Sequence, residues 1–112
     1  MPQLTIPERY RPGGPEDSEE LFSRMAEEWK AETRTLSSIT EMAIHPAYQR
    51  IIGMGPSALP YLLRRLESDP EQWFWALRAI TGADPVKPEH RGRIGKMSGD
   101  WLDWARENGF SW

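Results

Sequence analysis

The sequence predicts an all-α protein, a small bundle of four to six helices behind an extended, proline-rich N-terminal arm. Apolar residues recur three and four positions apart, as on one face of a helix, and prolines and glycines separate these segments. No alternating run of apolar and polar residues exceeds four residues, so no segment indicates a strand. The 112 residues suit one domain, which we place at residues 18–112, with the arm at residues 1–17.

The arm combines four prolines with the pair Gly13-Gly14. Proline lacks a backbone N–H and obstructs helix formation, so we expect an extended chain here. Three apolar residues lie along it, Leu4, Ile6 and Tyr10. They can pack against the domain, stay disordered with the rest of the arm, or dock on a partner, and Tyr10 is the residue that we expect to contact a partner.

The first helix is predicted at residues 18–36. Ser18 suits the N-cap, and the two glutamates after it suit the positive end of the helix dipole. The apolar face of this helix consists of Leu21, Phe22, Met25, Trp29 and Leu36. A short second helix at residues 39–43 is predicted to end before Pro46, because the residue before a proline avoids the α conformation.

Three further helices are predicted, at residues 46–53, 56–66 and 70–82. A proline at the first position opens the first and the third of them, and glycine ends each, at Gly53 or Gly55 and at Gly82. Asp69 is predicted to be the N-cap of the third helix. The apolar stripe of the middle helix consists of Leu59, Leu62, Leu63 and Leu66.

The end of the chain is predicted to be a loop followed by one more helix. Residues 83–97 contain two prolines and two glycines, which is typical of a loop. The last helix is predicted to begin at Ser98 or Asp100 and to end at Gly109 in a left-handed C-cap. Its apolar residues Trp101, Leu102, Trp104 and Ala105 cannot all face the core, so we expect one of the two indoles to be at least partly exposed.

The composition excludes several kinds of site. The chain has no cysteine, which excludes disulfides, thiolate metal ligands and a cysteine nucleophile. His45 and His90 are the only histidines, so we expect no metal ion, and no motif indicates a cofactor. The net charge of −3 does not favour general binding of nucleic acid. No apolar run approaches the roughly 20 residues of a membrane span, and the N-terminus lacks a signal-peptide core, so we expect a cytoplasmic protein.

The segment GMGPSALPYLLRRL, residues 53–66, resembles the turn and second helix of a HEAT-type repeat. Residues 69–82 are then similar to the first helix of the next repeat. The resemblance covers about half of the chain and implies a scaffold that binds other proteins on a helical face. The runs HPAYQRIIGMG and WFWALRAITG are also similar to a small uncharacterised bacterial protein family, and that similarity implies no activity.

The six tryptophans have a structural explanation, because one buried indole removes on the order of 150–250 Å² of surface from water. Trp73, Phe74 and Trp75 are consecutive, so on a helix they point about 100° apart. Unless that helix is central and buries all three, one ring, Trp75, is exposed as an anchor for a partner. Arg78, three residues later, can stack on Trp75 or bind a carboxylate.

These features predict a non-enzymatic protein–protein interaction module, such as an antitoxin-like or accessory subunit of a bacterial two-protein system. Its predicted partner-binding residues are Trp75, Arg78, Trp104 and Tyr10. Neither the carboxylates nor the serines form a catalytic motif, so no catalytic residue is predicted. A homodimer that forms through the apolar face of residues 21–29 is an alternative mode of assembly.

The alternative function is a small enzyme or nucleic-acid-binding effector, in which His45, Tyr48 and Arg78 converge with a basic loop at residues 87–96. This loop has a net charge of +3, enough to bind a few phosphates. Its cationic residues are Lys87, Arg91, Arg93 and Lys96. The same residues also have structural explanations, in which His45 caps a helix and Arg91 or Arg93 pairs with the acidic first helix, so we favour a protein over a nucleic acid as the partner.

Overall fold

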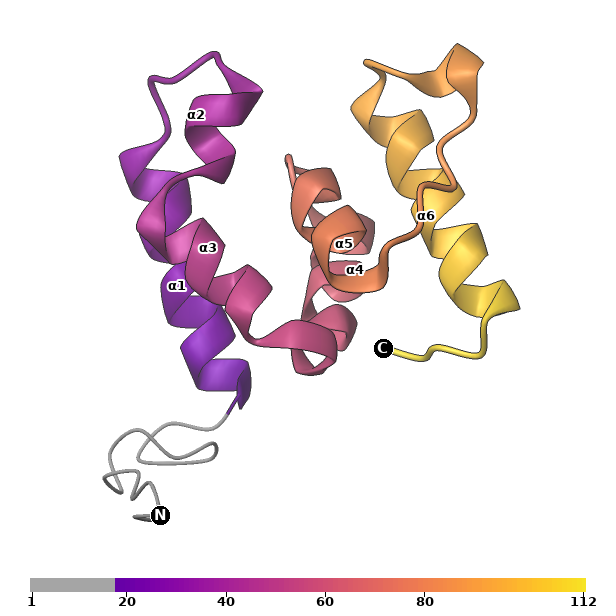
Figure 1. The fold of residues 1–112 in the computed structure, drawn as a ribbon, viewed down its shortest axis with the longest axis horizontal. Helices are drawn as coiled ribbons and strands as arrows, with labels where there is room; N and C mark the ends of the chain where they lie inside the picture. Colours follow the sequence, from indigo (N-terminus) through magenta and orange to yellow (C-terminus); the bar gives the residue numbers. More distant parts are fainter. Residues whose placement is uncertain (1–17) are drawn as a thin grey trace, which may run out of the picture.

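The computed structural model describes residues 18–112, and this part of the chain is helical without any strand (Figure 1). Its α-helices are α1 (Ser18–Glu32), α2 (Ile39–Ala43), α3 (Pro46–Gly53), α4 (Leu59–Ser68), α5 (Phe74–Thr81) and α6 (Ile94–Glu107). Two short 3-10 helices are η2 (Gly55–Ala58) and η3 (Pro88–His90). The all-α class is confirmed, whereas Tyr10 and the rest of the arm lie outside the described residues.

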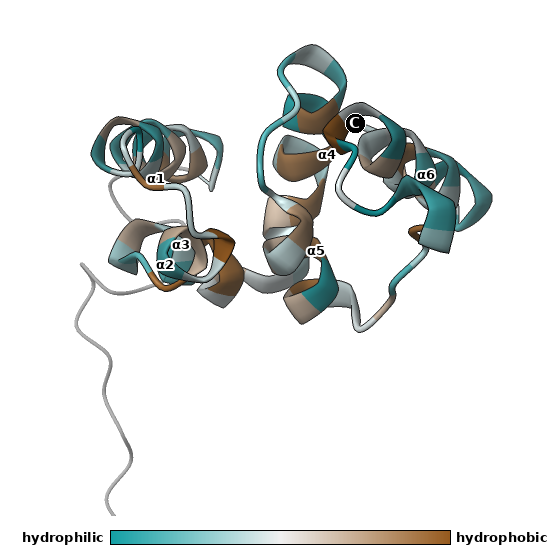
Figure 2. Cartoon of the chain, turned by 90° about the horizontal axis from the view of Figure 1, so that it is seen from above, coloured by the Kyte–Doolittle hydropathy of each residue, from teal (hydrophilic) through white to brown (hydrophobic). Residues whose placement is uncertain are grey.

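The helices form two groups that meet at α3 and α5. Helices α1, α2 and α3 lie on one side of the molecule, and α4, α5 and α6 lie on the other (Figures 1 and 2). Helix α3 packs against α1 and α5, while α4 packs against α6. In a HEAT-type repeat α3 and α4 would pack on each other, but here α3 packs mainly on α1 and α5, and α4 packs on α6. The resemblance to a HEAT-type repeat stays a prediction.

The core is built around the ring of Trp73, which is fully buried. Its centroid lies 4.5 Å from that of Trp29 and 5.6 Å from that of Tyr48, on which it stacks at 10°. The ring of Phe22 is 6.0 Å away. Trp29 Nε1 also donates a hydrogen bond of 2.8 Å to the carbonyl of Met42, which attaches α2 to α1. Core filling therefore accounts for these two tryptophans.

The apolar face of α1 is covered by the chain itself. Phe22, Met25 and Trp29 are each only 2% exposed, and α3 packs over this helix. The homodimer considered above would need the same side chains at a contact between two chains. In the structure these side chains are buried inside the single chain and are not exposed for such a contact.

Helix α5 begins at Phe74 and not, as predicted, directly after Asp69. The side chain that caps its first turn belongs to Tyr48 on α3. The Tyr48 hydroxyl accepts a hydrogen bond of 3.0 Å from the Ala76 N–H and donates one of 2.8 Å to the Gln72 carbonyl. Burial raises the pKa of Tyr48, although the Ala76 N–H alone would lower it. The start of α5 is thus fixed by a contact with α3.

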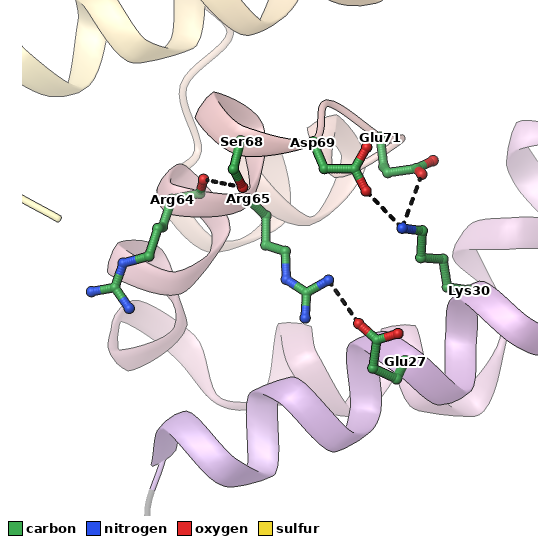
Figure 3. Close-up of polar contacts among 7 residues, drawn as sticks. All are labelled: Glu27, Lys30, Arg64, Arg65, Ser68, Asp69 and Glu71. Carbon is green, nitrogen blue, oxygen red and sulfur yellow. Dashed lines mark hydrogen bonds and ion pairs between the residues drawn. The ribbon is translucent and has the colours of Figure 1, made fainter.

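Asp69 instead belongs to ion pairs between α1 and the end of α4 (Figure 3). Lys30 Nζ lies 2.6 Å from the Asp69 carboxylate and 3.6 Å from that of Glu71. Arg65 and Glu27 form another pair at 3.0 Å. The hydrogen bond between Lys30 and Asp69 raises the pKa of the lysine and lowers the pKa of the aspartate. Because at least one partner of each pair is exposed, these ion pairs contribute little to the stability of the fold.

The end of α1 and the start of α6 also differ from the predictions. Helix α1 ends at Glu32, four residues early, and the hydroxyl of the next residue, Thr33, donates a hydrogen bond of 2.6 Å back to the Trp29 carbonyl. Helix α6 begins at Ile94, inside the predicted loop, so neither Ser98 nor Asp100 caps it. Instead, both residues lie inside α6, and their side chains are buried in the protein.

The helix ends that were predicted at glycines are confirmed. Helix α3 ends at Gly53. Gly82 follows α5 with a φ of 74°, and Gly109 lies just beyond α6 with a φ of 80°. Side chains with a Cβ are strained in this left-handed region, which glycine adopts freely. Helix α4 begins at Leu59, three residues later than predicted, because η2 precedes it.

Candidate functional site

A groove of about 610 Å³ opens between α2, α5 and α6. It is called the Trp75 groove here, and its lining includes Ile39, Trp75, Arg78, Asp84, Arg91 and Met97. Ligand pockets in proteins commonly measure about 300–1,000 Å³. The Trp75 groove therefore has room for a few side chains of a partner or for a small molecule.

Trp75 is the exposed member of the three consecutive aromatic residues. Trp73 and Phe74 are 0% and 5% exposed, whereas Trp75 is 45% exposed. The turn of about 100° per residue in a helix separates their directions in this way. Ile39, on α2, is 51% exposed and lines the same groove. Covering these two apolar side chains would remove apolar surface from water, which favours binding.

Three charged residues lie in the groove beside Trp75. The Arg91 guanidinium donates a hydrogen bond of 2.9 Å to Asp84. This bond lowers the pKa of Asp84, and the nearby charge of Arg78 lowers it further, while burial opposes both. Within residues 18–112, Arg78 itself forms no ion pair and does not stack on Trp75, so of the two roles considered for Arg78 only the binding of a carboxylate stays open. Because Asp84 and Arg91 neutralise each other, Arg78 is the uncompensated positive charge.

The loop at residues 82–93, which forms one wall of the groove, is attached to α6 through Asp100. Asp100 accepts a hydrogen bond of 3.0 Å from the backbone N–H of Lys87 and lies 2.7 Å from His90 Nδ1. Burial alone would raise the pKa of Asp100, but these two contacts lower it on balance. Asp100, which was predicted to cap the last helix, therefore fixes the position of the loop that lines the groove.

Replacing Asp100 by alanine should lower the free energy of unfolding by about 1–3 kcal/mol at neutral pH, because the Lys87 N–H would lose its acceptor in a partly buried position. The difference from the unmodified chain should shrink in acid. A carboxyl group whose pKa is lower in the folded state stabilises the fold above its unfolded pKa of about 3.9. That contribution is lost as the pH falls through the lower pKa that Asp100 has in the folded protein.

Urea unfolding at a series of pH values measures both effects. Asp103→Ala, on the exposed face of the same helix, is the matched control and should change stability by less than about 0.5 kcal/mol. Equal losses from Asp100→Ala and Asp103→Ala would contradict the role given to Asp100.

Trp104 is half-buried and does not line the Trp75 groove. Its ring meets that of Trp101 edge-on at 5.4 Å and stacks on Phe110 at 5.7 Å. Trp101 is fully buried, so one indole of α6 is partly exposed, as predicted.

Among the four cationic residues of the basic loop, only Arg91 lines the groove. Lys87, Arg93 and Lys96 are exposed, and in the part of the chain that the structure describes none of them forms an ion pair. Arg91 pairs with Asp84 of its own loop and not, as expected, with the first helix. The unpaired charges of the loop, on Lys87, Arg93 and Lys96, therefore lie outside the Trp75 groove.

His45 and Tyr48 make structural contacts outside the groove. His45 Nδ1 accepts a hydrogen bond of 3.1 Å from Ala47 N, which caps α3, and Nε2 lies 3.1 Å from the Glu32 carboxylate. Tyr48 is fully buried, and its hydroxyl bonds to backbone groups only. Neither residue lines the groove that contains Arg78.

Ile39 and Met97 are among the lining residues that were not predicted as site residues. Met97 was placed in a loop, although Ile94, Met97 and Trp101 follow helical spacing and indicate an earlier start of the last helix. Two glycines within this stretch obscured the pattern. For Ile39 no sequence signal exists, because the orientation of a five-residue helix depends on what it packs against.

Within residues 18–112, no three His, Cys, Asp or Glu side chains are grouped so as to hold a metal ion. No helix in this same range has the length and apolar character that a membrane span requires. No protein-family model matches the chain, and no curated protein or solved structure is detectably similar to it. A functional proposal therefore depends on the Trp75 groove itself.

Proposed function

We propose that this chain is a non-enzymatic protein-interaction module that binds a partner protein through the Trp75 groove. The observation that carries this proposal is the 45% exposure of Trp75 in a groove that also contains the exposed Ile39. Tryptophan is enriched among the few residues that dominate the binding energy of interfaces. The type of protein we propose is an antitoxin-like or accessory subunit of a bacterial two-protein system in the cytoplasm.

A protein partner has more support than a nucleic acid or a substrate. The net charge of the chain is −3, and Arg91 is already paired with Asp84. An enzyme of the kind considered above would need His45 and Tyr48 near Arg78, and both make structural contacts elsewhere. The HEAT-type resemblance also favours a scaffold that binds proteins.

Photo-crosslinking from the groove tests the proposal. With p-benzoylphenylalanine in place of Trp75, the full chain should form one defined adduct with another protein in the cells from which it comes. The benzophenone side chain is larger than an indole, but Trp75 is exposed on the outer side of α5, so the fold should be retained. The adduct should be lost when Ile39 is also replaced by aspartate, because a charge would then enter the apolar contact.

The matched control places the same crosslinker at Phe110, an aromatic residue that is 37% exposed and lies outside the groove. We expect no such adduct from this position. Identical adducts from both positions, or none from Trp75, would overturn the proposed function.

A further inference from the structure

The Trp75 groove combines apolar side chains with one unpaired positive charge. Trp75, Ile39 and Met97 supply apolar surface from three different helices. Methionine adapts its shape to a partner more readily than branched side chains do. Among the described residues Arg78 has no ionic partner, while Arg91 and Asp84 neutralise each other.

We propose that the groove accepts a short segment of the partner protein in which apolar side chains stand next to an aspartate or glutamate, and that this carboxylate pairs with Arg78. The inference rests on the proposed function and adds the chemistry of the partner. The apolar side chains would lie against Trp75 and Ile39. The carboxylate would complete the charge balance of the groove.

The charges of the groove favour one more carboxylate, because Arg78 and Arg91 supply two positive charges and Asp84 supplies one negative charge. Asp84 lies in the same groove, and the positive charges of Arg91 and Arg78 both favour its ionised form. A guanidinium also matches a carboxylate with two parallel hydrogen bonds, which gives the contact a defined geometry. Arg78 is exposed at the groove and free to form such a pair.

The size and charge of the groove favour a protein segment over other occupants. A volume of about 610 Å³ holds a few side chains, as in the recognition of a helix or extended peptide in a groove. A nucleic acid would need several unpaired cations along its backbone, and the groove offers one. The apolar face of α1, through which a homodimer was considered, is already buried under α3 and is not exposed to a second copy.

Selection from a random peptide library displayed on phage, with the full chain as bait, tests the inference. We expect the selected peptides to share apolar residues next to an aspartate or glutamate. Their affinity should fall roughly tenfold or more in Arg78→Glu, because a like charge would then face the carboxylate. It should fall as strongly in Trp75→Ala, which removes the apolar contact.

Arg50→Glu is the matched control for charge. Arg50 is exposed on α3, lies outside the groove and, within residues 18–112, forms no ion pair. The affinity of the peptides for this variant should stay within about twofold of the unmodified chain. Circular dichroism of all variants checks that each retains the helical fold.

The outcomes separate the inference from the proposed function. Peptides that need Trp75 but contain no acidic residue, or bind equally to Arg78→Glu, would overturn the inference and leave the interaction module intact. Peptides that bind Trp75→Ala as well as the unmodified chain would overturn both. Binding of oligouridine RNA that is lost in Arg78→Glu, or a dimer in light scattering that the same variant abolishes, would show a different occupant and also overturn the inference.

Discussion

Replacing Trp73 by alanine should lower the free energy of unfolding by about 3–5 kcal/mol, as large aromatic residues do when they are truncated in protein cores. Trp73 is fully buried against the rings of Phe22, Trp29 and Tyr48. Alanine would leave a cavity between α1 and α3, which cannot close unless both helices move. Small domains are stable by only about 5–15 kcal/mol, so the midpoint of urea unfolding should drop markedly.

Trp75→Ala is the control for this prediction, because it makes the same change two residues away. Trp75 is 45% exposed, so its loss should change stability by less than about 1 kcal/mol. If Trp73→Ala does not fold, Trp73→Phe should fold with an intermediate stability. Trp73 Nε1 has no hydrogen-bond partner among the described residues, so phenylalanine removes an unpaired donor together with some volume. Equal stabilities of Trp73→Ala and Trp75→Ala would contradict this assignment of the core.

Replacing Tyr48 by phenylalanine should lower the free energy of unfolding by about 1–3 kcal/mol, although the ring and its packing are kept. The loss comes from the hydroxyl, which serves Ala76 N–H and the Gln72 carbonyl at once. Both backbone groups would lose this partner. Urea unfolding measures the cost, and hydrogen exchange should show faster exchange of the amides in the first turn of α5.

Tyr61→Phe is the matched control for the hydroxyl. Tyr61 is half-buried on α4 beside Phe22, and within residues 18–112 its hydroxyl makes no hydrogen bond. Stability should therefore change little in this variant. A loss from Tyr61→Phe as large as that from Tyr48→Phe would mean that the capping of α5 by Tyr48 contributes nothing.

The helices themselves could be predicted from local patterns. Glycines at positions 82 and 109 mark left-handed helix ends, and a proline at position 46 marks the start of α3. These signals work because the conformations of glycine and proline depend mainly on their own backbone. The helical turn between neighbouring residues left two possibilities for residues 73–75, burial of all three rings or exposure of Trp75, and the structure shows the second.

The two aspartates that were predicted to cap helices show where local patterns fail. Asp69 bonds to Lys30, 39 residues away, and Asp100 bonds to Lys87, 13 residues away. An aspartate can accept a hydrogen bond from any donor, and only the tertiary fold decides which donor is near. The same holds for Tyr48, because no sequence pattern indicates that a tyrosine on one helix caps another.

Helix α5 has only eight residues, and isolated helices shorter than about 12–15 residues are barely stable in water. Its order therefore depends on the interior, while its outer side carries Trp75 and Arg78. A molecule that binds there holds in place a segment that forms only when the whole domain is folded. By mass action, such a molecule raises the melting temperature of the entire chain. Binding at the outer side of α5 and folding of the domain are therefore coupled equilibria.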